Sequence, residues 1–237
     1  AGPRDFSYDL AVDADYKRIE DFLEGFENAA DIFDGSLKLQ GRATGNLEGY
    51  TLAAERVIID NMPAYGFEAA GKLVQTRGEQ TEVSLIASGS MSSVERLAKL
   101  SGIDLSAFGT ARANVVLSGT VEQPYVEEFV VITRNDDGLA INMSGSLSLR
   151  EVVDAAAKRD NRISIDVSGP DLASIEPWIG KQPYEIGPWY GSAMISGTRR
   201  GIILEDFIME FGTQQTMEFK LAGGISDIDL NRPFTLA

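Results

Sequence analysis

The feature of this 237-residue sequence that most constrains its fold is the recurrence of short segments that end in glycine. In one set of three segments the glycines lie 78 residues apart in both intervals, and in a second set the intervals are 74 and 78 residues. The glycines are Gly41, Gly119 and Gly197 in the first set and Gly71, Gly145 and Gly223 in the second. A third set, at residues 6–13, 82–89 and 162–169, opens each unit. Such a period predicts one elongated region of three like units, at about residues 5–80, 81–160 and 161–230.

The segments within each unit alternate apolar and polar residues, which is the pattern of a β-strand with one buried face. In the third unit, for example, Ile163, Ile165 and Val167 alternate with polar neighbours. Residues 135–138 (Asn-Asp-Asp-Gly) and 198–201 (Thr-Arg-Arg-Gly) stand between alternating segments and predict hairpin turns. The sequence therefore predicts a mostly β fold in which antiparallel strands form a sheet with one apolar face.

Short helices are expected after the first strand of each unit, with one further helix in the second unit. Ser92 and Glu95 have the spacing of a capping box, and so do Ser148 and Glu151. The expected helices span residues 19–26, 92–102, 149–158 and 171–176.

The composition excludes several classes of function. The chain has no cysteine and no histidine, so it cannot use a thiolate nucleophile, a Ser-His-Asp triad or imidazole metal ligands. Its 21 basic and 36 acidic residues give a net charge of −15, which opposes binding to a phosphate backbone. We therefore expect a non-catalytic protein with no catalytic residues, no metal, no cofactor and no nucleic-acid partner.

Several motifs have a structural and a functional interpretation. Residues 135–138 lack the ligand spacing of an EF-hand loop and are expected to form a turn. Trp178, Tyr184, Trp189 and Tyr190 crowd one corner, where we expect loop packing, with binding of a sugar or lipid head group as the alternative. With 36 acidic residues, coincidental carboxylate pairs are expected, so no glycosidase is inferred from them.

The third unit carries a resemblance to a known family. Residues 163–175 (Ile-Ser-Ile-Asp-Val-Ser-Gly-Pro-Asp-Leu-Ala-Ser-Ile) are followed by Ile186-Gly187-Pro188 and by a strand ending in Leu221-Ala222-Gly223. This order resembles the repeat of AsmA-like proteins of the TamB and YhdP type, found in Gram-negative bacteria. The second unit matches well and the first loosely. The resemblance implies an elongated, curved sheet shaped like a trough, in a periplasmic protein anchored to the inner membrane by a segment outside this sequence.

The resemblance also implies bridge-like transport of phospholipids in support of outer-membrane biogenesis. The partners would be phospholipid acyl chains, and membranes would be reached through parts of the protein outside this segment. An acyl chain costs about 0.8 kcal/mol per CH₂ in water, and a continuous apolar lining removes that cost. The residues expected to line the trough are Val83, Leu85, Val115, Leu117, Leu139, Ile141, Met143, Ile163, Ile165, Val167, Ile195, Phe207, Met209, Phe219 and Leu221.

The alternative is a structural or protein-interaction scaffold for outer-membrane protein assembly, in which the same repeats close over a filled core. Residues 232–237 resemble the start of another first strand, so we expect the array to continue in a longer protein. A stack cut from such an array leaves unpaired edge strands, which predicts end-to-end self-association of this fragment.

Overall fold

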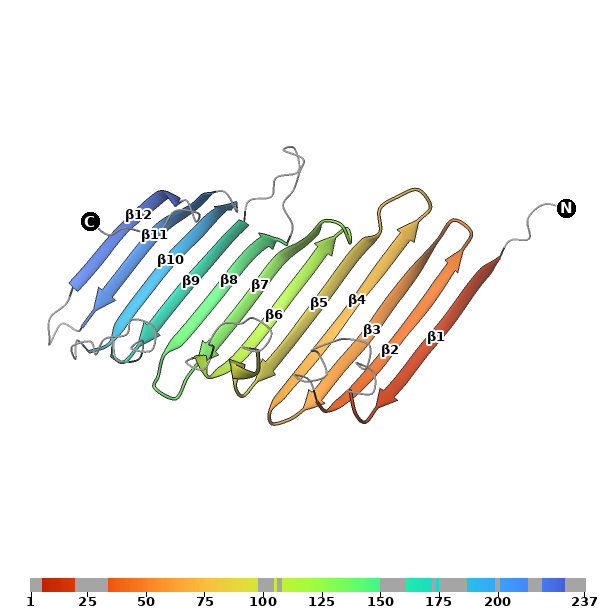
Figure 1. Ribbon diagram of the computed structural model, residues 1–237, viewed down its shortest axis with the longest axis horizontal. Coiled ribbons are helices and arrows are strands. Elements are labelled where there is room, and N and C mark those ends of the chain that lie inside the picture. Colours follow the sequence, from red (N-terminus) through yellow and green to blue (C-terminus); the bar gives the residue numbers. More distant parts are fainter. Residues whose placement is uncertain are drawn as a thin grey trace.

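A computed structural model describes residues 6–19, 34–97, 105, 108–149, 161–171, 174, 187–198, 201–212 and 219–228. These residues form one sheet of twelve strands, in which each strand pairs with its neighbours in the sequence (Figure 1). The strands are β1 (Ser7–Tyr16), β2 (Ser36–Asn46), β3 (Gly49–Asn61), β4 (Tyr65–Thr76), β5 (Glu82–Met91), β6 (Thr110–Gly119), β7 (Pro124–Arg134), β8 (Ala140–Ser148), β9 (Asn161–Gly169), β10 (Trp189–Thr198), β11 (Gly201–Phe211) and β12 (Phe219–Ile228). A short 3-10 helix, η1 (Val94–Leu97), follows β5.

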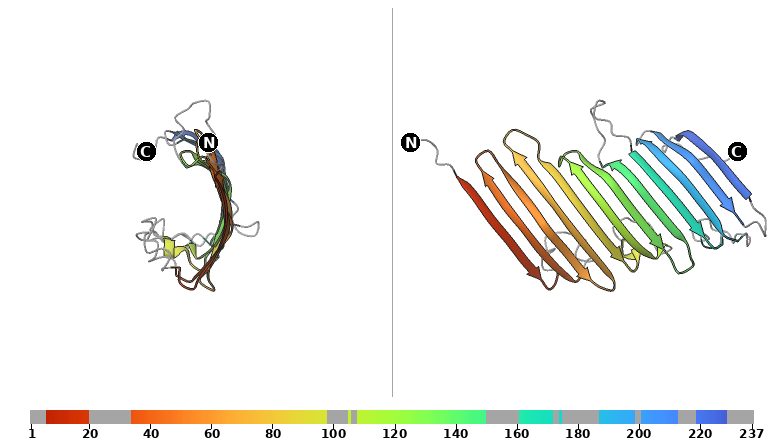
Figure 2. Two further views of the ribbon diagram at one scale, coloured as in Figure 1. Left: turned by 90° about the vertical axis from the view of Figure 1, so that its right-hand side faces the viewer. Right: turned by 180° about the vertical axis from the view of Figure 1, so that it is seen from behind.

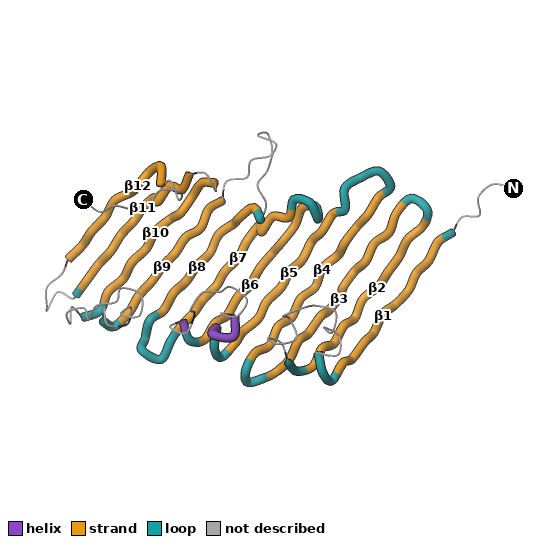
Figure 3. The backbone as a smooth tube through the Cα atoms, viewed as in Figure 1, coloured by secondary structure: helices purple, strands orange, loops and turns teal. Residues whose placement is uncertain are grey.

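The sheet is an open antiparallel meander. Strand follows strand along the sheet, and β1 and β12 form its two edges without meeting. Figure 3 shows that strands account for most of the described chain, with turns at the two ends of the strands. The prediction of a mostly β, antiparallel fold is therefore confirmed.

The expected helices fall mainly on residues outside the described ranges. These are residues 20–33, 98–104, 150–160 and most of 171–176. The described part of the segment 92–102 contains η1, whose first residue, Val94, donates a backbone hydrogen bond to the carbonyl of Gly109 at 2.9 Å. This bond ties η1 to the start of β6.

The strand order can be compared with the predicted units. Strands β1–β4, β5–β8 and β9–β12 lie within the three unit ranges, and the first set of glycines falls in β2, β6 and β10. The glycines do not all occupy the same place in their strands, because Gly41 is central in β2 whereas Gly119 ends β6. Superposition of three like units therefore stays a prediction.

Four strands contain an extra residue that shifts the pairing register. The shifts in β3, β7 and β11 lie between Ala54 and Val57, between Val126 and Phe129, and between Leu204 and Phe207, and the shift in β12 lies between Ile225 and Ile228. A β-bulge of this kind bends its strand and increases the local twist. Seen along the long axis of the sheet, the strands bend to one side, so that the sheet has a concave and a convex face (Figure 2).

The buried core lies on the concave side. η1 is seen there in Figure 2, and Val94 of η1 packs with Tyr65 and Met91 in one buried cluster. A second buried cluster contains Leu139, Ile141 and Trp189. The side chains of these strand residues therefore mark the concave face.

Candidate functional site

The pairing register extends this assignment to the whole sheet. Direct antiparallel partners share a face, and so do residues two apart in a regular strand. Tyr65 and Phe67 of β4 lie on the concave side, so Ala69, two residues after Phe67 in the same strand, lies there as well. The direct partners of Ala69 can then be followed from strand to strand in both directions, which gives one complete row. This row consists of Ala14, Leu39, Val57, Ala69, Ala87, Val115, Phe129, Gly145, Ile163, Ile195, Leu204 and Ile225, one residue from each strand. We call the face that carries this row the concave apolar face.

Polar side chains are confined to the margins of the concave apolar face. Its tyrosines, together with Asn61, Gln75, Thr133 and Asn161, lie within the first or last two residues of their strands. No described residue that the register places on this face carries a charge. The middle of the face can therefore contact hydrocarbon without desolvating a charged group.

The fifteen residues expected to form an apolar lining all lie on this face. Fourteen are strand residues placed there by the register, and Leu139 precedes β8 and is buried beside Ile141. They are Val83 and Leu85 in β5, Val115 and Leu117 in β6, Leu139, Ile141 and Met143 in or before β8, Ile163, Ile165 and Val167 in β9, Ile195 in β10, Phe207 and Met209 in β11, and Phe219 and Leu221 in β12. Their role as a lining stays a prediction.

Sequence reasoning missed the share of the face contributed by β1–β4. Leu10, Leu39, Leu52 and Leu73 lie there by the same register. These strands alternate as the others do, but many of their concave positions hold alanine or glycine, which weakens the apolar signal.

The side chains of the concave apolar face are not equally buried. Tyr65, Leu139 and Trp189 are buried at one end of the strands. Leu52, Leu221 and Ile225, in contrast, remain 45–50% exposed. The exposed apolar side chains thus lie toward the two edges of the sheet, and exposed apolar surface is where an apolar partner would bind or an interface would form.

The convex face carries the charged side chains of the strands and most of their polar ones, together with a few exposed isoleucines such as Ile86 and Ile132. Its exposed ion pairs include Arg42–Asp9 at 3.3 Å, Arg56–Glu68 at 2.8 Å and Lys220–Glu210 at 2.6 Å. Exposed pairs of this kind add little stability, so they mainly keep this face hydrated. The two faces therefore differ sharply in chemistry.

Two aromatic side chains on the concave side anchor chain connections through polar groups. The Tyr65 hydroxyl donates to Asp34 and accepts the backbone N–H of Asp34 at 2.5 Å, while Asn61 donates to the Asp34 carboxylate at 2.7 Å. Burial of the phenol and the adjacent Asp34 carboxylate raise the pKa of Tyr65. The indole N–H of Trp189 donates to the carbonyl of Asp171 at 3.0 Å. These contacts hold the residues before β2 and after β9 against the sheet.

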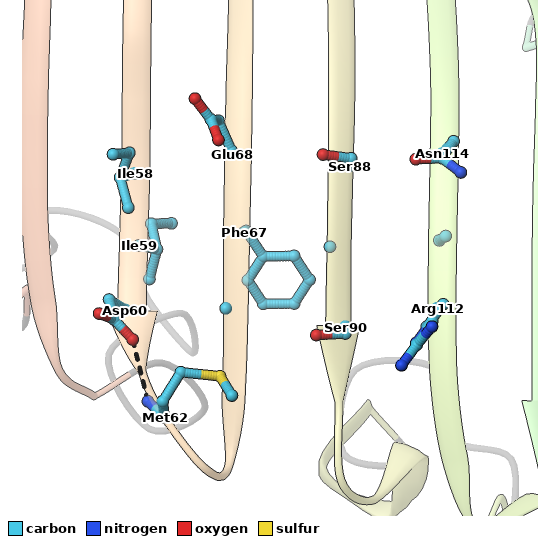
Figure 4. Close-up of a pocket in the computed structure, with 13 residues that line it drawn as sticks. Ile58, Ile59, Asp60, Met62, Phe67, Glu68, Ser88, Ser90, Arg112 and Asn114 are labelled. Carbon is cyan, nitrogen blue, oxygen red and sulfur yellow. Dashed lines mark hydrogen bonds between the residues drawn. The ribbon is translucent and has the colours of Figure 1, made fainter.

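A depression of about 500 Å³ lies across β3–β6, and most of its polar side chains belong to the convex face (Figure 4). Its charged groups include Glu68, which pairs with Arg56, and Asp60, which accepts the backbone N–H of Met62 at 3.0 Å. Across the described parts of the chain, no three potential metal ligands cluster. The depression therefore offers no concentrated chemical site.

The bulges bring serine and glutamate together in two strand pairs. Ser118 donates to the Glu127 carboxylate at 2.5 Å, and Ser196 donates to the Glu205 carboxylate at 3.4 Å. Both serines belong to the Ser-Gly ends of the recurring segments. Their hydrogen bonds help to hold the bulged glutamates in place. The sequence signal was two successive polar residues where strict alternation allows one.

Comparison of the chain with protein-family models, with curated proteins and with solved structures finds no match. No helix within the described ranges is long and apolar enough to cross a membrane. The functional argument consequently rests on the concave apolar face itself.

Proposed function

We propose that this chain is a non-catalytic lipid-binding segment that holds phospholipid acyl chains along its concave apolar face. The observation that carries the proposal is the uncharged apolar row that crosses all twelve strands, opposite a convex face that carries the charged side chains. At about 4.8 Å per strand, eleven intervals make this face about 50 Å long. A surface of that length removes acyl chains from water without needing a specific polar contact.

The wider role follows from the resemblance to AsmA-like proteins. In this proposal the sheet is a trough built from three like units, and it forms part of a longer periplasmic protein anchored to the inner membrane. Phospholipid would pass along the trough in support of outer-membrane biogenesis.

A closed scaffold is the second candidate, and the buried end of the face favours it. There Ile141 is only 6% exposed, beside Leu139 and Trp189. If another protein covered the rest of the face in the same way, the surface would be a core and not a lipid site.

A charge placed on the exposed part of the face distinguishes the two candidates. Leu52→Asp and Phe219→Asp alter side chains that are 45% and 55% exposed, whereas Ile141→Asp would disrupt a packed cluster under either candidate. The matched control is Ile86→Asp, because Ile86 is 63% exposed on the convex face of an inner strand. Co-purified phospholipid is measured by mass spectrometry, together with the thermal melting of each variant.

For a lipid site, both concave variants should lose bound phospholipid several-fold, because an unpaired charge is costly next to hydrocarbon. Their melting temperatures should stay within about 3 °C of that of Ile86→Asp, which should retain its lipid. Wild-type protein free of phospholipid, or unfolding of the concave variants alone, would support the scaffold and overturn the proposal.

A further inference from the structure

Among the described residues, each of the two edge strands has one side without a paired strand. Within the described chain, β1 pairs with β2 alone and β12 with β11 alone. Both edges are ten residues long, and the register between β1 and β2 is unbroken. Long edges without a covering element are templates for pairing with another strand.

The direction of the strands decides which edges can meet. All neighbouring strands are antiparallel and there are twelve of them, so β1 and β12 run in opposite directions. A second copy displaced along the sheet, without rotation, therefore brings its β1 antiparallel to β12 of the first copy. This is the same relation that joins every neighbouring pair within the chain.

The side chains at the two edges also match. Leu10 and Val12 of β1 and Leu221 and Ile225 of β12 lie on the concave apolar face and are 44–58% exposed. Each of these side chains has a neighbouring strand on one side only, which leaves its other side exposed. Pairing β12 with β1 would cover all four side chains and continue the concave apolar face from one copy into the next.

We propose that the chain assembles head to tail, with β12 of one copy paired to β1 of a second copy. Because the two joined surfaces differ, the contact does not close on itself and each added copy leaves one free edge of each kind. For this segment by itself, the occupant of each edge is thus a second copy of the segment, in the place that a continuing array would take in a longer protein, and the assembly presents one lengthened concave apolar face.

Charged side chains at the edges test the proposal, because inward-pointing lysine is a natural way to block edge pairing. The β1 variant is Leu10→Lys with Val12→Lys, and the β12 variant is Leu221→Lys with Ile225→Lys. The control is Ile86→Lys with Ile132→Lys, which adds the same charge at exposed positions on the convex face of inner strands. Molar mass is measured over a concentration series by sedimentation velocity, with circular dichroism to confirm that each variant is folded.

The wild type and the control should increase in mass with concentration, while each edge variant alone should remain a monomer. An equimolar mixture of the two edge variants should form a dimer and nothing larger, because each supplies the one edge that the other lacks. A wild type that stays monomeric at all concentrations overturns the proposal. Dimerisation of either edge variant alone also overturns it, since that result requires β1–β1 or β12–β12 pairing.

Discussion

At the scale of single residues, a few polar groups fix the chain against an otherwise apolar face. Tyr65 and Trp189 are both buried, and each directs its one hydrogen-bond donor at a residue of a chain connection. A buried phenol or indole without a partner would be unfavourable, so the connection and the aromatic side chain stabilise each other.

Tyr65→Phe should therefore lower the free energy of unfolding by about 1 kcal/mol at neutral pH, through loss of the hydrogen bonds with Asp34. The pKa of Tyr65 is raised in the folded state, so the unfolded state loses this proton first, at about pH 10. The contribution of Tyr65 is thus complete below that pH and declines above it. Urea unfolding at pH 7 and above pH 10 measures the difference between wild type and variant.

That difference should shrink as the pH passes 10. Tyr50→Phe is the control, because Tyr50 is 37% exposed and should give a small difference at every pH. A Tyr65 effect that remains constant across this range would contradict the assigned linkage.

At the scale of strands, the sequence predicted the alternation and the antiparallel turns but not the bulges. The turn at residues 135–138 joins β7 to β8 as expected, with Gly138 donating to the Asn135 carbonyl at 3.3 Å. The bulge after Val126 was missed because Glu127 and Glu128 look like a local break in alternation, and only the partner strands reveal an inserted residue. Such pairings join neighbouring strands, so the pattern within one strand does not contain them.

Close packing between neighbouring strands also sets which residue sizes are allowed. A Cβ atom added to Gly89 of β5 would overlap the ring of Phe67 on β4, which lies over the glycine on the concave side. Aromatic rings placed over glycines in neighbouring strands are a known means of fixing register.

Gly89→Ala should consequently destabilise the protein by about 1–3 kcal/mol, because the Phe67 ring must move. Gly223→Ala is the matched control in β12, since nothing lies within 4 Å of the added Cβ, and it should be neutral or slightly stabilising. Denaturant unfolding compares the two. The second substitution Phe67→Leu should relieve part of the Gly89→Ala penalty, and equal effects at both glycines would contradict this account.

At the scale of the whole molecule, the chain exposes far more surface than a compact fold. The chain has 16399 Å² of accessible surface, against about 10,400 Å² expected for a compact protein of 25.6 kDa. Substantial contacts between described elements occur only between adjacent strands. Stability in such an array is close to a sum of nearest-neighbour terms, as in repeat proteins.

The sequence could not reveal which part of the apolar face is covered. Ile141 and Phe219 follow the same alternation and were expected to be equivalent, yet they are 6% and 55% exposed. Ile141 packs in a cluster with Leu139 and Trp189, whereas Phe219 begins an edge strand. This difference arises from contacts between distant segments and from position in the sheet, neither of which a periodic pattern contains.

Nearest-neighbour stabilisation predicts a gradient of hydrogen exchange across the sheet. In dilute protein, amides of β1 and β12 should exchange fastest, because each edge strand is held from one side and local opening needs no second break. Strands β4, β5, β8 and β10 should exchange slowest, since each has two partner strands and contributes a buried residue to one of the two clusters. Exchange measured by mass spectrometry at low and high protein concentration resolves these regions. If copies pair edge to edge, protection should rise with concentration in β1 and β12 and stay constant in the inner strands. Uniform exchange from β1 to β12 would instead mean that the sheet opens as a single cooperative unit.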